Sequence, residues 1–391
     1  MSDAPNKQTL RNPDIDTGDD MYDSPEDIQL AGALQGALKQ WEKLADLYWD
    51  SNKEAMRKQS RYRKLVTWGV VGGCAAVILA ILQLFFGGTH LLDSIFKSKA
   101  ELASMIVVSL EALAALGACA IVIWGLSTKT HEHWLLERHR AERVRLQKYR
   151  SLIEFGLKGL SDSELPKWSA EQRRKIEVIE HLKEEGLQNW ISENYTSYDE
   201  FEPKDDCISE GAAADLLEYF RKKRLSVQTN YFLKKSKEAE QKNWVTRRFP
   251  AVLLLASFAF AFFHFGLDLY VKIAATAVAT AGSAQSAAED CSAACNSLTG
   301  TTSAAFALIA FAACAPVLGS AIRTYRNAYE FARNSLRFLA NFRELDFRSG
   351  KLSHAGQSTK EILKQLWKVE DTLEREHREW LRLMIEAEWY G

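Results

Sequence analysis

The stretch LVTWGVVGGCAAVILAILQLFF, residues 65–86, decides the fold of this chain because it contains no charged side chain. An α-helix rises about 1.5 Å per residue, so roughly 20 residues cross a hydrocarbon core of about 30 Å. Residues 102–126, 251–271 and 302–322 have a similar length and apolar character. Lipid offers no hydrogen bonds to the backbone, so we predict that all four runs are membrane-spanning helices. The alternative is four buried core helices, which usually keep a polar stripe.

The overall composition conceals this division. The chain has 391 residues and a formal net charge of -1, and its mean hydropathy of -0.23 resembles that of a soluble protein. The average combines apolar runs with segments that are dense in Lys, Arg, Glu and Asp. The balanced charge therefore gives no indication of a nucleic-acid partner, and we expect none.

Basic side chains flank the four runs on one side. The loops on the opposite side contain only Lys97, Lys99 and Lys272 as basic residues. Cationic flanks mark the cytoplasmic side of a membrane protein, so we predict that both termini are cytoplasmic. The flanking residues on that side include Arg57, Lys58, Arg61, Arg63, Lys64, Lys129, Arg138, Arg140, Lys242, Arg247, Arg248, Arg323 and Arg326.

The rest of the chain divides by charge and helical periodicity. We predict an all-α membrane protein with four transmembrane helices in two hairpins, continued by long cytoplasmic helices that form a bundle. The helix over 28–64 is expected to run directly into the first span, and Pro250 is expected to start the third. Apolar residues with helical spacing, such as Leu34, Leu38 and Trp41 and, near the C-terminus, Leu366 and Val369, predict apolar stripes that need packing partners. Within 159–211 we expect a helix over 170–187 and a loop over 195–206. The expected segments are a disordered acidic tail (1–27), cytoplasmic helix (28–64), first hairpin (65–126), cytoplasmic helix (127–158), insert of unassigned role (159–211), cytoplasmic helix (212–250), second hairpin with an extracytoplasmic loop (251–322) and C-terminal cytoplasmic helices (323–391).

Polar residues inside the spans are candidates for pore lining or gating. Glu111 is costly in lipid and is expected to face other helices or water. His264 and Asp268 are four residues apart and therefore share one helix face, while Pro316 would kink the fourth span. For each of these residues, a helix-packing or interfacial role is the alternative to a role in the pore.

Two cysteines and a histidine cluster raise further questions. Cys291 and Cys295 form either a local disulfide in an oxidising compartment or two free small residues. His131, His133, Glu137 and His139 could bind a metal, but an interfacial helix explains them better. The sequence contains no glycine-rich phosphate loop, nucleophile elbow or His-Glu-x-x-His motif. We therefore expect a non-enzyme without a cofactor or a metal site.

Three helical motifs surround the predicted hairpins. The first follows the first hairpin, the second precedes the second hairpin, and the third lies near the C-terminus. Their residues include Trp134, Arg138, Glu142, Arg145, Tyr219, Arg224, Gln228, Tyr231, Glu370, Glu376 and Trp380. Together the motifs resemble the SLATT superfamily, a bacterial two-helix membrane effector module. The resemblance covers about residues 40–155 and 216–386, and this chain departs from it by having four spans.

The resemblance implies an oligomeric inner-membrane effector of bacterial antiphage defence. Such a protein would form a pore in the membrane, or permeabilise it, when a nucleotide second messenger or a sensor protein activates it. We find no separate nucleotide-sensing domain, so the trigger would act through a partner or through the cytoplasmic helices. The alternatives are a regulated ion channel and a membrane scaffold that recruits cytosolic partners.

Overall fold

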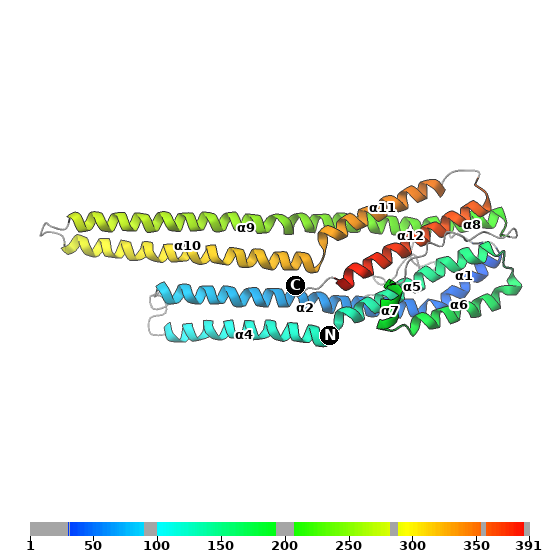
Figure 1. The fold of residues 1–391 in the computed structure, drawn as a ribbon, viewed down its shortest axis with the longest axis horizontal. Coiled ribbons are helices and arrows are strands. Elements are labelled where there is room, and N and C mark those ends of the chain that lie inside the picture. Colours follow the sequence, from blue (N-terminus) through cyan, green and yellow to red (C-terminus); the bar gives the residue numbers. More distant parts are fainter. Residues whose placement is uncertain are drawn as a thin grey trace. The chain divides into compact units, whose positions relative to one another are not determined.

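The computed structural model describes residues 30, 32–89, 100–192, 207–281, 288–352 and 357–386. All regular structure in these ranges is helical, which confirms the all-α prediction for this part of the chain (Figure 1). The predicted tail, 1–27, lies outside the described residues. The elements are α1 (Gly32–Leu44), α2 (Asp46–Thr89), α4 (Ala100–Ser127), α5 (Thr130–Leu157), η4 (Asp162–Glu164), α6 (Leu165–Glu180), α7 (Glu184–Ser192), α8 (Glu210–Phe220), η5 (Arg221–Leu225), α9 (Ser226–Ala281), α10 (Ala288–Ala328), α11 (Phe331–Leu352) and α12 (Thr359–Glu386).

Among the described residues, four stretches of helix are long and apolar enough to cross a membrane, and each overlaps a predicted span. They lie within Asp46–Gln83, Met105–Gly125, Glu210–Ala274 and Leu308–Leu352. In the most apolar part of each stretch, no more than 22% of the residues are buried. Phe258 and Phe262, for example, are 68% and 74% exposed. Core helices of a soluble protein would be covered by other protein, whereas these faces are bare and suited to contact with lipid.

The chain forms two compact units. The first comprises Met1–Tyr62, Lys129–Ala239 and Ala332–Gly391, and the second comprises Arg63–Thr128 and Glu240–Phe331. Helices α2 and α9 are continuous across the boundaries that fall within them. The other two boundaries lie close to Lys129 and Glu330, whose φ angles are 45° and 51°. A left-handed backbone conformation costs a non-glycine residue about 1 kcal/mol. In each half of the chain, one boundary between the units therefore lies within an unbroken helix and the other lies close to a strained residue.

The core of the first unit contains the predicted apolar stripes of α1 and α12. Leu34, Leu38 and Trp41 of α1 are buried, as are Leu366 and Val369 of α12. The single helix expected over 28–64 is instead two helices, because α1 ends at Leu44 and α2 begins at Asp46. Asp46 occupies the first turn of α2, where a carboxylate is stabilised by the helix dipole.

The 159–211 segment contributes its helices to the same unit. The helix expected over 170–187 is divided between α6 and α7. Trp168 and Ile176 of α6 and Trp190 of α7 are buried. The predicted loop within this segment lies mostly outside the described residues. The described part of the segment therefore belongs structurally to the first unit.

Within the second unit, α2 contacts α4, and α9 contacts α10. A Cβ added to Gly72 would lie 3.3 Å from the Cβ of Ala118, and the ring centroids of Phe260 and Phe311 lie 5.9 Å apart. Pro250 does not begin a helix as predicted but lies inside α9. A proline removes only one backbone donor, and the apolar helix continues through it.

Candidate functional site

A buried arginine–glutamate pair is the best-defined polar feature of the first unit. Nε and Nη2 of Arg224 each donate to one carboxylate oxygen of Glu370 at 2.8 Å. The two side chains are 1% and 0% exposed. The Arg224 guanidinium also lies 4.7 Å from the centre of the Tyr149 ring. This bidentate geometry joins η5 to α12, and the ring of α5 covers one face of the cation.

The local backbone at Arg224 is unusual. η5, Arg221–Leu225, is a π-helical turn inserted between α8 and α9. Such turns are rare, and they occur frequently at functional sites. The hydroxyl of Tyr149 donates to the backbone carbonyl of Lys223 within the same turn at 3.3 Å. The π turn and the buried ion pair are therefore parts of one site.

A second charged group lies on α5. Glu142 forms ion pairs with Arg138 and Arg145, one turn before and one turn after it. Burial is the largest influence on the Glu142 carboxyl and raises its pKa, but the charges of Arg138, Arg145 and Arg224 together outweigh it and hold the pKa below its usual value. Glu142 is consequently ionised at neutral pH despite its burial.

Two buried histidines join α5 to α12. Nδ1 of His139 lies 3.1 Å from Nε2 of His377, and the two rings stack with centroids 5.3 Å apart. Burial, followed by the charge of the other histidine, lowers the pKa of His139, and burial followed by Arg138 lowers that of His377. Both rings are neutral at pH 7, so that one ring nitrogen donates and the other accepts.

Residues of the three helical motifs converge in this region. Trp134 and Trp380 make an edge contact with centroids 6.0 Å apart, and Arg337 pairs with Glu376 at 3.4 Å. Tyr219 and Gln228 are buried, and Tyr231 packs against Phe338. Motifs that are far apart in the sequence therefore form one network on α5, η5 and α12. The network comprises Trp134, Arg138, His139, Glu142, Arg145, Tyr149, Arg224, Glu370, His377 and Trp380.

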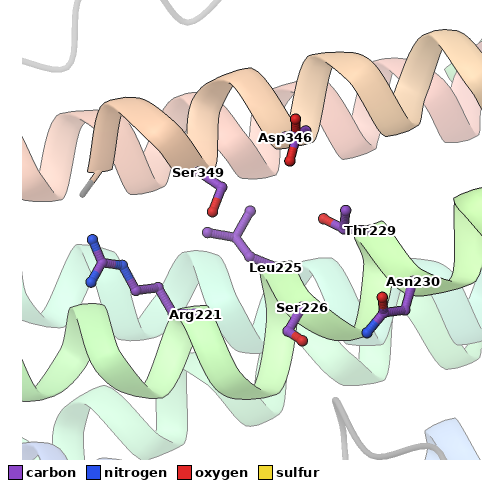
Figure 2. Close-up of a pocket in the computed structure, with 7 residues that line it drawn as sticks. All are labelled: Arg221, Leu225, Ser226, Thr229, Asn230, Asp346 and Ser349. Carbon is purple, nitrogen blue, oxygen red and sulfur yellow. The ribbon is translucent and has the colours of Figure 1, made fainter.

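A polar groove lies beside the π turn (Figure 2). Its volume is about 350 Å³, and its walls come from η5, α9 and α11. Arg221 donates to the carbonyl of Leu352, while its buried Nε has no hydrogen-bond partner among the described residues. The groove offers a cation, a carboxylate, hydroxyls and an amide to a small polar ligand. Sequence reasoning did not find it, because its residues resemble ordinary polar surface: Arg221, Leu225, Ser226, Thr229, Asn230, Asp346 and Ser349.

The structure assigns a packing contact to one of the candidate gating positions. Pro316 lies within α10 and cannot donate to the carbonyl four residues before it, which is that of Ala312. Ser257 of α9 donates to this carbonyl at 2.7 Å. A polar side chain on a neighbouring helix thus satisfies the group that the proline leaves free, as apolar surroundings require.

The other intramembrane candidates remain separate. Glu111 is half-buried on α4 and His264 is half-buried on α9, and no hydrogen bond or ion pair joins them within the described chain. Nδ1 of His264 is buried without a partner there. Asp268 lies in α9, but its side chain is outside the described residues. Gating roles for these residues remain predictions.

Cys291 and Cys295 lie in α10, but their side chains are outside the described residues. A disulfide between them and two free cysteines both remain predictions. Among the described residues, no group of three or more His, Cys, Asp or Glu side chains could hold a metal ion. His139, from the histidine cluster considered above, pairs instead with His377.

In its described residues the chain is all-helical, with four helices suited to crossing a membrane and a helical unit with a charged interior. Comparison with protein-family models, with curated proteins and with solved structures found no match in any of the three.

Proposed function

We propose that the protein is a bacterial inner-membrane effector that oligomerises and permeabilises the membrane when a trigger acts on its first unit, in antiphage defence. In this proposal the apolar helices cross the bilayer as two hairpins, and the first unit is a cytoplasmic bundle together with both termini. The observation that carries the proposal is the bare apolar surface of all four helices. The basic flanks support the orientation, and the resemblance to SLATT modules supports the role in defence.

The buried network supports control by the first unit. In the proposed resting state, Arg224 and Glu370 hold η5 against α12. A buried ion pair is weak as a source of stability but is suited to a switch with two arrangements, because separating its partners leaves two uncompensated charges. The adjoining groove would receive a polar trigger, such as a nucleotide second messenger, or part of a sensor protein.

A leakage experiment tests this proposal. Wild-type protein, Glu370→Gln and Glu379→Gln are reconstituted into dye-loaded liposomes and are also overexpressed in cells. Glu379 lies on the same helix but is exposed, so its variant is the matched control. We expect Glu370→Gln to release dye and to be toxic without a trigger, whereas Glu379→Gln behaves like wild type.

Each remaining outcome of this experiment has a definite meaning. Absence of leakage and of toxicity for every variant would refute the permeabilising function. Ion-selective currents in planar bilayers without dye release would instead support a regulated channel. Thr229→Trp, which fills the groove, should block triggering of wild type but not the leakage of Glu370→Gln.

A scaffold that recruits cytosolic partners is the second candidate function. Leu336 and Phe347 of α11 are 71% and 58% exposed on the first unit, where each could contact a partner protein. A scaffold would retain its activity in Glu111→Ala and lose it in Leu373→Pro, which breaks α12. A permeabilising effector in which Glu111 lines the pore should be impaired by both variants.

A further inference from the structure

Exposed cations lie at one end of the second unit, on α2, α9 and α10. Three contacts tie these helices together at that level. The Arg63 guanidinium lies 5.8 Å from the centre of the Tyr329 ring, whose hydroxyl donates to the carbonyl of Arg63. Nε of Arg326 donates to Oδ1 of Asn243 at 3.1 Å. We call the exposed cations at this end the basic patch: Arg63, Lys64, Lys242, Arg247, Arg248 and Arg323.

The acidic residues in the segments that carry the basic patch are few. Over 63–68, 240–250 and 323–330 they are Glu240 and Glu330, each at the end of its segment farther from the apolar run. Cations therefore outnumber acids where the apolar helices begin and end. An ordinary solvated helix surface mixes the two signs of charge.

Exposed aromatic side chains accompany these cations. Trp68 of α2 and Trp244 of α9 are 62% and 55% exposed, and Phe249 is 50% exposed. The Arg248 guanidinium lies 4.2 Å from the centre of the Trp244 ring. Tryptophan with adjacent arginine or lysine at the end of an apolar helix is typical of the level of lipid headgroups.

We propose that the basic patch binds the headgroups of anionic phospholipids and discriminates against zwitterionic ones. The arginines supply paired donors for phosphate oxygens, while the tryptophans lie among the headgroups and the first carbons of the acyl chains. This inference rests on the proposed membrane placement but not on permeabilisation. A nucleic acid would match the charge alone, but the exposed Trp68, Trp244 and Phe249 beside the apolar helices favour lipid.

Lipid titration with matched variants tests the patch. Purified protein in detergent is titrated with dansyl-labelled phosphatidylglycerol or phosphatidylcholine, and energy transfer from tryptophan reports binding. Each cation near an anionic lipid surface changes affinity by about fivefold. Replacing Arg247, Arg248 and Arg323 by glutamine should therefore weaken phosphatidylglycerol binding on the order of 100-fold, with little effect on phosphatidylcholine.

Three controls separate the possible outcomes. Replacing the same residues by lysine should largely retain the preference for phosphatidylglycerol. The charge-matched variant Lys167→Gln, Arg173→Gln and Arg174→Gln, at exposed positions of α6, should leave it unchanged. Equal binding of both lipids by wild type, or an undiminished preference in the glutamine variant, would overturn the proposal. Recovery of wild type in the soluble fraction without detergent would instead refute the membrane placement itself.

Discussion

Removing the carboxylate of Glu370 should destabilise the first unit strongly. Its partner Arg224 is 1% exposed and would lose both hydrogen bonds of 2.8 Å. The guanidinium would remain buried over the Tyr149 ring without the carboxylate with which it forms its bidentate pair. Breaking a buried pair in this way costs about 3–5 kcal/mol. We therefore expect Glu370→Leu to lower the unfolding free energy of this unit by that amount.

The double variant gives a sharper expectation. Arg224→Met combined with Glu370→Leu removes both charges together with the cost of burying them. Pairs of this kind are often replaced by apolar residues with little loss of stability. The double variant should therefore be more stable than the single variant Glu370→Leu, although it carries the same substitution and one more.

Hydrogen exchange measured by mass spectrometry in detergent suits this test, because a chain with two units need not unfold in one step. Where exchange follows the opening free energy, 3–5 kcal/mol corresponds to exchange that is about 150-fold to about 5,000-fold faster in α5 and α12. Glu379→Leu, at an exposed position of α12, is the control and should change little. A loss below about 1 kcal/mol for Glu370→Leu, or additive losses in the double variant, would refute the reasoning.

Three other substitutions or conditions give separate predictions. The pKa values of His139 and His377 in the folded chain lie below 6.5, the ordinary value that applies to the unfolded chain. As pH falls, the unfolded chain therefore takes up protons before the folded chain does, and the folded state loses stability. Denaturant titrations should show full stability above about pH 7.5 and a loss of about 1.4 kcal/mol per histidine at pH 5.5, which a variant with phenylalanine at both positions should not show. The buried indole N–H of Trp41 donates to the Ser151 hydroxyl at 2.7 Å. Ser151→Ala removes this acceptor and should lower the free energy of unfolding by about 1–3 kcal/mol in the same titration. An unchanged unfolding midpoint would contradict this. Ser257→Ala should lower the thermal stability of the second unit by about 0.5–2 kcal/mol, whereas in a Pro316→Ala background, where the backbone donor is restored, the same substitution should cost less.

The sequence was sufficient to predict the four apolar helices because the thickness of lipid sets their length. It was also sufficient to predict the buried apolar stripes of α1 and α12, because their apolar residues recur with helical spacing. Leu38 of α1 and Leu366 of α12 are two of these residues, and both are buried. It did not predict the break at Ala45, since neither glycine nor proline marks it. Proline was also an unreliable boundary, because Pro250 lies inside α9.

The charged interior could not be predicted from one sequence. Arg224 and Glu370 are 146 residues apart, and a charge on an amphipathic helix ordinarily indicates a solvated face. The signal was present in part: Arg224 and Gln228 occupy positions between the buried aromatic residues Phe220 and Phe232. Periodicity can place a charge on an inward face, but it cannot identify the residue that neutralises it.

The π turn has a geometric consequence for the helix that contains it. Phe220, Arg224, Gln228, Phe232 and Ser236 are all buried and follow one another at intervals of four residues. In an unbroken α-helix each such step rotates the side chain by about 40° beyond a full turn, so the row would wind about 160° around the cylinder. The wide turn at η5 takes up roughly one residue, or about 100°, and straightens the row. Deleting Lys222, which is exposed, should restore α-helical hydrogen bonding there and leave the rotation between Phe220 and Ser236 unchanged, because it removes the one residue that the wide turn takes up.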